Sequence, residues 1–311
     1  MKKFIFRFKE FSFKENLDER GSILVIIAIT MVVLLGMTAL VTDVGAMALN
    51  RNRLQAAADS AALAGAQELP FNTALARSVA EDYLKKNLND SYNPIISFSE
   101  SNQKITVEIT RNIEFSFARV LGINDNDVKV SAAAINAPAR SVVSGLRPFG
   151  IVWNPALDFK SGEEVILKYI PNIKQEDELG PGNFGSVNLW GKDPHYKYSE
   201  NILYGTKNHY AIGDGVDTFP GNNAGPTAKS IRDLLDENGG SVTIMVPLFS
   251  TMDVSGNKEI IITGFAAFRV EDVEEKGNNV DVRGRFVEHV TLGNADLGGS
   301  YHGVRAVNLV E

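Results

Sequence analysis

The sequence predicts an α+β protein that is anchored by one transmembrane helix near its N-terminus. Three observations predict it: a charge-free apolar run over residues 22–42, an alanine-rich helical pattern that follows directly, and alternating apolar residues from residue 95 onward. We expect the helix to continue into a small α+β unit over residues 43–137, followed by a mainly β domain over residues 149–311.

The composition excludes several classes of site and partner. The chain has 311 residues with 31 Lys and Arg against 38 Asp and Glu, for a formal net charge of −7. This acidic balance argues against nucleic acid as a partner, because phosphate-backbone binding needs a basic surface. The absence of cysteine excludes disulfides, thiolate metal sites and cysteine nucleophiles.

Residues 22–42 form the predicted transmembrane helix, bounded by Arg20 and Asp43. About 20 apolar residues cross a bilayer core of roughly 30 Å, and a signal-peptide core has only about 7–15. Six basic residues precede the run: Lys2, Lys3, Arg7, Lys9, Lys14 and Arg20. Because basic flanks stay in the cytoplasm, we expect residues 1–21 to be a cytoplasmic tail and everything after residue 42 to be extracytoplasmic.

The helical pattern continues to residue 69 with many small residues, and proline is absent until Pro70. Its small-residue stripe consists of Leu54, Ala58, Ala61, Ala62 and Gly65. Such a stripe permits close backbone approach, and we expect this half to pack within its own domain. In the membrane half, Gly36 and Ala39 suggest contact with a partner helix.

A second helix is predicted over residues 73–87, with Leu75, Val79, Tyr83 and Leu84 on its inner face. Strands are expected over residues 95–98, 104–110, 113–117 and 128–137, with a short helical turn over residues 117–122. Residues 138–148 form a polar, turn-rich join. The β domain that follows is expected to contain one helix over residues 226–238, stopped by Gly239 and Gly240.

No constellation in the sequence indicates catalysis, so we expect neither an enzyme nor a cofactor. The four histidines lack metal-binding spacing. Asp214, Asp217 and Asn222 offer oxygen ligands for calcium, although tight turns use the same residue types. The string DVSGN at residues 253–257 is typical of a hairpin turn.

Two blocks in the first half carry a family resemblance. They are ERGSILVIIAIT with DVGAMALNRNRLQAAADSAALAGA, and FSFARVLGINDNDVKVSAAA. They resemble the N-terminal region of TadG-like proteins of Flp (tight-adherence) pilus assembly, over about the first 140 residues. PFGIVW, GFAAFRV and GRFVEHV in the second half resemble the C-terminal region of TadG-related proteins. The resemblance implies a pilin-like first unit and partners among pilins or proteins of the Tad assembly platform.

The resemblance also raises the question of processing between Gly21 and Ser22. Flp-type prepilins are cut after a glycine, and the pilins of that group carry a glutamate five residues beyond it. Here Gly21 follows Arg20, but the fifth residue is Ile26. Cleavage at Gly21 therefore stays an open alternative to an intact N-terminus.

Two functions from different classes are consistent with this sequence. The first is a membrane-anchored accessory or minor-pilin-like component of Flp/Tad pilus assembly, acting by protein–protein interaction at the bacterial cytoplasmic membrane, with an outer domain that contacts the pilus, the cell wall or a substrate. The alternative is an anchored surface adhesin or carbohydrate binder unrelated to a pilus. Trp153 and Trp190 are candidates for sugar stacking, although both also suit a core.

Overall fold

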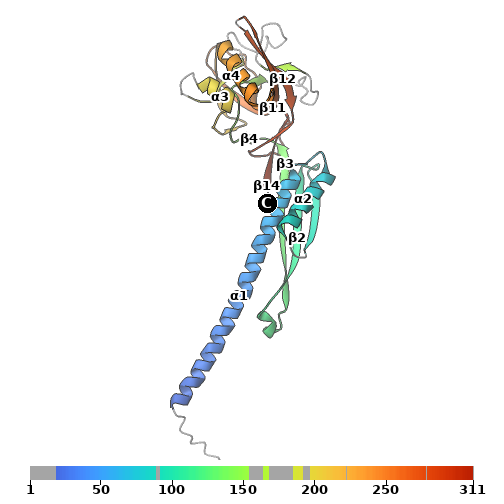
Figure 1. Ribbon diagram of the computed structural model, residues 1–311, viewed down its shortest axis with the longest axis vertical. Coiled ribbons are helices and arrows are strands. Elements are labelled where there is room, and N and C mark those ends of the chain that lie inside the picture. The colour runs from blue at the N-terminus through green and yellow to red at the C-terminus, as the bar shows by residue number, and fades with distance from the viewer. Residues whose placement is uncertain are drawn as a thin grey trace, which may run out of the picture. The chain divides into compact units, whose positions relative to one another are not determined.

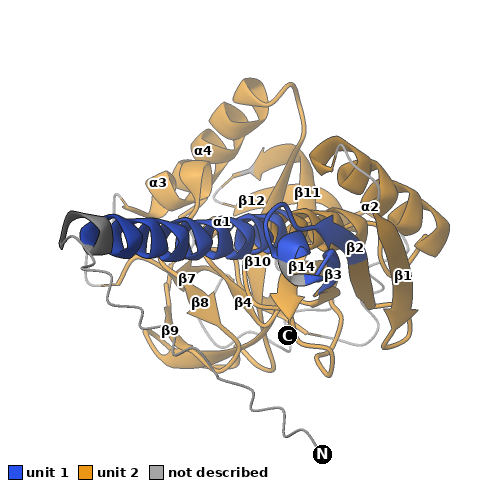
Figure 2. Ribbon diagram, turned by 90° about the horizontal axis from the view of Figure 1, so that it is seen from below, with its two compact units in different colours: residues 1–53, 110–129 blue, residues 54–109, 130–311 orange. Residues whose placement is uncertain are grey.

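The computed structural model describes residues 19–88, 92–153, 164–167, 185–191, 197–221, 223–277 and 279–310. Over these ranges it has four α-helices and fourteen strands, which confirms the predicted α+β class. The chain divides into two compact units: residues 1–53 with 110–129, and residues 54–109 with 130–311 (Figure 2). The predicted cytoplasmic tail lies outside the described residues up to residue 18.

The first element, α1, is one continuous helix over Glu19–Ala66 (Figure 1). Alanine has the highest helix propensity and no proline interrupts the segment, so the helix does not stop at the end of the apolar run. In its last part Leu54, Ala58, Ala61 and Ala62 are fully buried. This stripe lies in the folded interior, as expected from its spacing.

Helix α2 (Thr73–Asn87) crosses α1 at Gly65. A Cβ atom added at Gly65 would lie 2.8 Å from the Ala76 carbonyl oxygen and 3.2 Å from the Ala80 Cβ. It would also lie 2.8 Å from the Ile105 Cδ1. The two helices can approach this closely only because α1 has no side chain at the crossing.

The inner face predicted for α2 is wrong at Leu75 and Tyr83, whereas Leu84 is buried and Val79 half-buried. The buried residues are Ala76, Ala80 and Leu84, whereas Leu75 and Tyr83 are 43% and 41% exposed. The close backbone approach at Gly65 explains the difference, because only small side chains fit opposite it. Apolar periodicity alone favours large residues and therefore selected a neighbouring face.

The C-terminal end of α1 is closed by Asn136. Its Nδ2 donates to the carbonyl oxygens of Ala66 at 2.9 Å and Leu69 at 2.8 Å. The Asn136 side chain is 1% exposed, so these carbonyl groups have a donor where water is excluded.

The first sheet has the strand order β1-β2-β3-β14-β13. Its strands are β1 (Asn93–Ser99), β2 (Lys104–Glu114), β3 (Asp125–Pro138), β13 (His289–Thr291) and β14 (Val304–Val310). The separate strand predicted over residues 113–117 is wrong, because β2 continues through Glu114. The short helical turn is confirmed as η1 (Ala118–Leu121).

The last strand of the chain returns to this first sheet. Strand β14 pairs antiparallel with β3, with Arg305 opposite Pro138 and Val310 opposite Ala133. The residues between β3 and β14 include all of the second sheet. The β domain is therefore connected to the first sheet at both of its ends.

The second sheet has the order β5-β10-β11-β12-β6, with β9 on β11 and β7 on β9. Its strands are β5 (Ile151–Val152), β6 (Val165–Ile166), β7 (Val187–Asn188), β9 (Gly215–Thr218), β10 (Val242–Phe249), β11 (Glu259–Lys276) and β12 (Asn279–Val287). A separate pair joins β4 (Ser141–Val142) to β8 (Tyr210–Ala211). Residues 253–257 connect the antiparallel strands β10 and β11, which confirms the predicted hairpin turn.

Strand β11 is buried on both faces. Ala266, Phe268 and Val270 belong to one apolar cluster, and Phe265 and Ala267 to a second. Successive side chains of a strand point to opposite faces, so this alternation places β11 between two cores.

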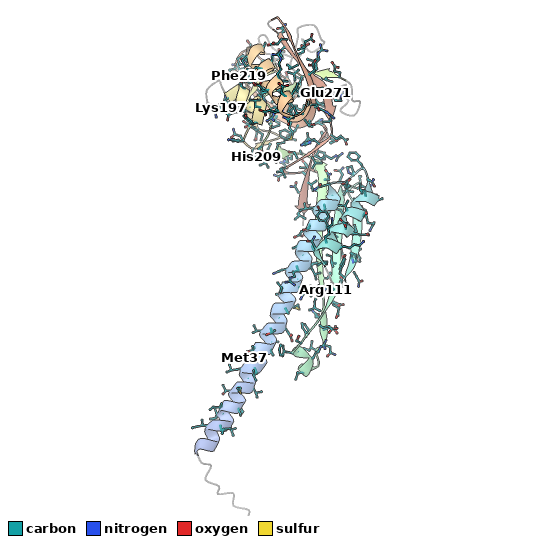
Figure 3. All side chains as sticks on the ribbon, in the orientation of Figure 1. Met37, Arg111, Lys197, His209, Phe219 and Glu271 are labelled. Atoms are coloured by element: carbon teal, nitrogen blue, oxygen red, sulfur yellow. The ribbon has the colours of Figure 1, made fainter. Side chains whose placement is uncertain are left out.

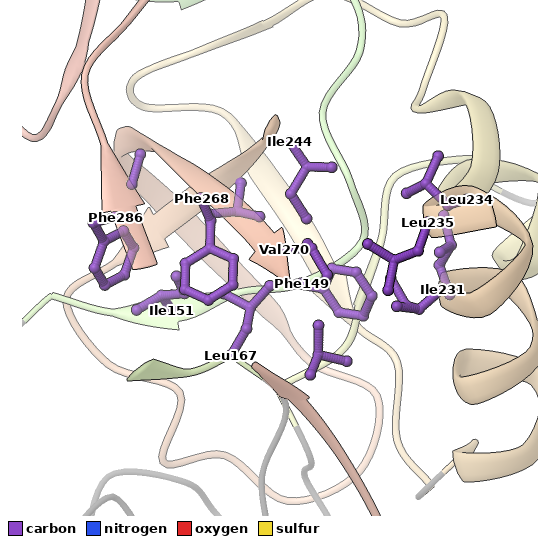
Figure 4. Packing of buried hydrophobic residues seen from close by; sticks show 14 of the residues in the cluster. Phe149, Ile151, Leu167, Ile231, Leu234, Leu235, Ile244, Phe268, Val270 and Phe286 are labelled. Atoms are coloured by element: carbon purple, nitrogen blue, oxygen red, sulfur yellow. The ribbon is translucent and has the colours of Figure 1, made fainter. Parts of the chain in front are cut away.

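Helix α4 (Ala224–Glu237) covers the first of these clusters. Its residues Ile231, Leu234 and Leu235 pack with Phe149 and Val270 (Figure 4). The Gly240 N–H donates to the Leu235 carbonyl at 2.8 Å, and Gly240 has a φ of 92°. The predicted helix with its glycine stop is confirmed. The short helix α3 (Lys197–Tyr204) contacts α4.

Residues 138–148, the predicted join, contain β4. The side chains of Val142 and Leu146 are fully buried there. Both belong to the second apolar cluster, so this segment takes part in the core.

We predict that Gly65→Val lowers the free energy of unfolding by about 1–3 kcal/mol, the usual cost of overpacking. The new side chain would overlap the Ala76 carbonyl and Ile105. Gly45→Val is the matched control, because a Cβ atom at Gly45 meets nothing within 4 Å. Urea unfolding of the detergent-solubilised chain, followed by circular dichroism, measures both. An equal effect of the two substitutions would contradict the crossing.

We predict that Asn136→Leu costs about 1–3 kcal/mol of stability, because the Leu69 carbonyl loses its side-chain donor and the Ala66 carbonyl keeps only the Leu69 N–H. The control is Asn87→Ala, whose exposed side chain donates to the Tyr83 carbonyl one helical turn earlier. The same unfolding measurement applies. A neutral Asn136→Leu variant would show that Asn136 does not close α1.

Candidate functional site

The N-terminal half of α1 presents an uncovered apolar surface. Its large apolar side chains from Ile23 to Val41 are between 48% and 71% exposed, and Met37 marks this stretch in Figure 3. Exposed apolar surface costs about 25 cal/mol per Å² in water. A stretch of this length therefore requires lipid or other apolar helices around it.

The polar groups of this half are satisfied inside the helix. The hydroxyl groups of Thr30, Thr38 and Thr42 donate to the carbonyl oxygens four residues earlier, each at 2.8 Å. Hydroxyl groups bonded in this way do not need water. Among the residues described, α1 is the one helix that is long and apolar enough to cross a membrane.

The predicted packing residues fall into two groups. Ala58 and Ala61 are fully buried and Gly65 lies at the α1–α2 crossing, so these three serve the folded interior. A Cβ atom at Gly36 meets nothing within 4 Å, which leaves the helix backbone open at that point. Gly21 and Ser22 lie within α1.

Asp43 ends the apolar run and holds the loop that joins β2 to β3. Its carboxylate accepts the backbone N–H groups of Ser116 at 2.9 Å, Phe117 at 2.9 Å and Ala118 at 2.7 Å. The Asp43 side chain is 5% exposed. The N–H groups at the start of a helical turn have no partner within that turn. The Asp43 side chain, which belongs to α1, accepts them and thereby caps η1.

Sequence reasoning identified Asp43 only as the boundary of the span. Its three partners lie 73, 74 and 75 residues further along the chain. The one signal in the sequence is its position as the first charged residue after a charge-free run. That position marks the end of the span and does not indicate a partner.

The structure describes two of the three calcium candidates, Asp214 and Asp217. The Asp214 Oδ2 accepts the Ala211 N–H at 2.8 Å, which closes a local turn. Asp217 lies in β9, opposite Glu259 and Asn188, and Asn222 lies outside the described residues. Within the described ranges, no group of three or more His, Cys, Asp or Glu side chains is placed to hold a metal ion.

Trp153 and Trp190 both pack against the first apolar cluster of the β domain. The Trp153 ring lies 4.2 Å from the His302 ring, between centroids, and burial lowers the pKa of His302. The Trp190 ring contacts Tyr198 and Phe219 edge-on at 5.9 and 5.0 Å.

Burial raises the pKa of Tyr198 to about 12, although hydrogen bonds with Ser186 and Thr227 act in the opposite direction.

Trp190 also lines a pocket of about 470 Å³. The other residues around this pocket include Asn201, Tyr204 and Asn208.

Residues 21–68 match the family model of TadE/G-like Flp pilus-assembly proteins. This segment is TadE/G-like. It corresponds to α1 from Gly21 to its end, so the resemblance predicted from the first blocks is confirmed there. The TadE/G-like match supports a role related to the Flp/Tad pilus, and the apolar helix indicates single-pass membrane anchoring. No curated protein and no solved structure matches the chain.

We predict that Asp43→Ala releases the loop between β2 and β3. Amide hydrogen exchange at Ser116, Phe117 and Ala118 should become faster, because these donors lose their acceptor. Asn50→Ala on the same helix is the control, since the Asn50 side chain bonds only within α1, to the Ala46 carbonyl. Unchanged protection of the three amides in Asp43→Ala would contradict the contact.

Proposed function

We propose that this chain is a membrane-anchored component of Flp/Tad pilus assembly, of the accessory or minor-pilin-like kind, which acts by protein–protein contact and not by catalysis. One observation carries the proposal. The TadE/G-like segment covers α1 from Gly21 to its end, and the first half of this helix is exposed and apolar while its second half is buried in a folded unit.

The proposed orientation places the N-terminus in the cytoplasm and the region after residue 42 outside the bacterial cytoplasmic membrane. The basic residues before the span support it, because positive flanks are retained inside. Outside the membrane, the β domain would be available to the pilus or the cell wall.

The proposed contact surface is the membrane half of α1 around Gly36. In lipid, helices associate by close packing and not by the hydrophobic effect, so small residues favour the interface. The open backbone at Gly36 provides such a place. The proposed partners are pilins or the membrane proteins of the Tad assembly platform.

Photocrosslinking in cells tests this surface. A photoreactive amino acid in place of Leu40, which is 56% exposed and lies one helical turn from Gly36 on the same face, should form adducts with a pilin or with a platform protein. The same amino acid in place of Leu292, which is 81% exposed in the other unit, is the control. Adducts with neither class of protein at position 40, together with normal Flp pili after deletion of the gene, would contradict the proposal.

Mass spectrometry of the native protein separates the two kinds of component. A mature N-terminus at Ser22 in the sheared surface fraction is expected for a minor pilin, because only a processed helix enters a fibre. An intact N-terminus confined to the membrane fraction is expected for an anchored accessory protein. Recovery of a soluble, unanchored form alone would overturn both.

A further inference from the structure

The loop between β2 and β3 ends in an exposed apolar tip. We use the name apolar tip for residues 115–124, which include η1. Its side chains Phe117, Val120 and Ile123 are 47%, 88% and 53% exposed. Val120 has the highest exposed fraction of the large apolar side chains that the structure describes. Three such side chains on one short turn are unusual for a surface that faces only water.

Asp43 fixes the position of this tip along α1. The carboxylate that ends the charge-free run binds the backbone of Ser116, Phe117 and Ala118. All of these residues belong to one compact unit, residues 1–53 with 110–129. Figure 3 shows the tip beyond Arg111, on the side toward Met37. Asp43 directly follows the apolar run, so the backbone of the tip is hydrogen-bonded within about one helical turn of the end of that run.

The tip also has a defined internal structure. The Phe115 N–H donates to the Asn124 carbonyl at 2.9 Å, and the Ile123 N–H donates to the Ala118 carbonyl at 3.2 Å. Gly122 closes the turn with a φ of 83°, a conformation that glycine adopts without strain. The apolar side chains are therefore presented by a closed turn and not by an extended loop.

The tip itself carries little charge, and the aspartates that follow it, Asp125 and Asp127, accept hydrogen bonds from Asn112. The Asp43 carboxylate is buried and accepts three N–H groups. Arg119, the one charged side chain within the tip, forms an ion pair with Glu114. A charged side chain with a long aliphatic stem, such as that of Arg119, is also accommodated at the level of the lipid headgroups.

We propose that the apolar tip inserts into the outer interfacial layer of the same membrane that α1 crosses, with Phe117, Val120 and Ile123 among the lipid headgroups and upper acyl chains. Lipid is the occupant that the structure favours, because the tip continues the exposed apolar surface of α1 at its outer end. The anchor then contacts the bilayer at two points, and the second point fixes the rotation of α1 about its own axis.

This inference rests on membrane anchoring by α1 and does not depend on the pilus role. The chain has no cysteine, so single cysteines can be labelled with an environment-sensitive fluorophore without background. The test uses Val120→Cys at the tip, Leu34→Cys within the span and Leu292→Cys as an exposed apolar control outside this unit. The full-length protein is reconstituted in phosphatidylethanolamine–phosphatidylglycerol vesicles that contain brominated acyl chains.

The proposal predicts blue-shifted emission and strong quenching at Val120, at a depth of about 5–10 Å into the headgroup–acyl boundary. Quenching should be greatest at Leu34 and absent at Leu292. Quenching at Leu34 with an aqueous signal at Val120 would overturn the tip insertion and leave the anchor intact. An aqueous signal at Leu34 would overturn the anchor and the tip insertion together.

Discussion

The structure depends on the need to cover the two halves of α1 in two different ways. From Ile23 to Val41 the helix carries apolar side chains that its own unit leaves exposed. From Leu54 onward the same helix is covered by its own fold, through buried alanines and the crossing at Gly65. The change of surroundings lies near Asp43, where a carboxylate binds backbone N–H groups and thereby takes a charged residue out of water. A continuous helix whose first half suits lipid and whose second half packs in a folded unit is expected of a membrane anchor that also forms part of that unit's core.

The predictions that succeeded rest on local properties of the chain. The apolar run, the alanine-rich continuation and the glycine stop after α4 depend on neighbouring residues, and the structure confirms each of them. The inner face of α2 was wrong because Gly65 determines it from another helix. The partners of Asp43 and the return of β14 to β3 involve residues far apart in sequence. No local pattern contains that information, since long-range pairing is decided by packing.

The two halves of the TadE/G-like segment differ in their surroundings. Its small residues look equivalent in sequence, yet Ala58 and Ala61 are fully buried while Gly36 is open. A Cβ atom at Gly36 meets nothing within 4 Å, so the chain's own fold does not use this position. The β domain adds a core on both faces of β11 and is connected to the first sheet at both of its ends. The exposed helix half is therefore the surface that best accounts for a role in an assembly.

The most direct test of this account is the reactivity of single cysteines along α1 toward a water-soluble maleimide. Full-length variants with one cysteine at each position from 23 to 53 would be reconstituted in vesicles and labelled from outside. If the first half of α1 crosses the membrane, we expect no reaction before residue 42 and a sharp rise soon after Asp43, on the faces of α1 that are exposed there. Reactivity that repeats every three to four residues through positions 23–42 would contradict it, because that pattern belongs to an amphipathic helix in contact with water.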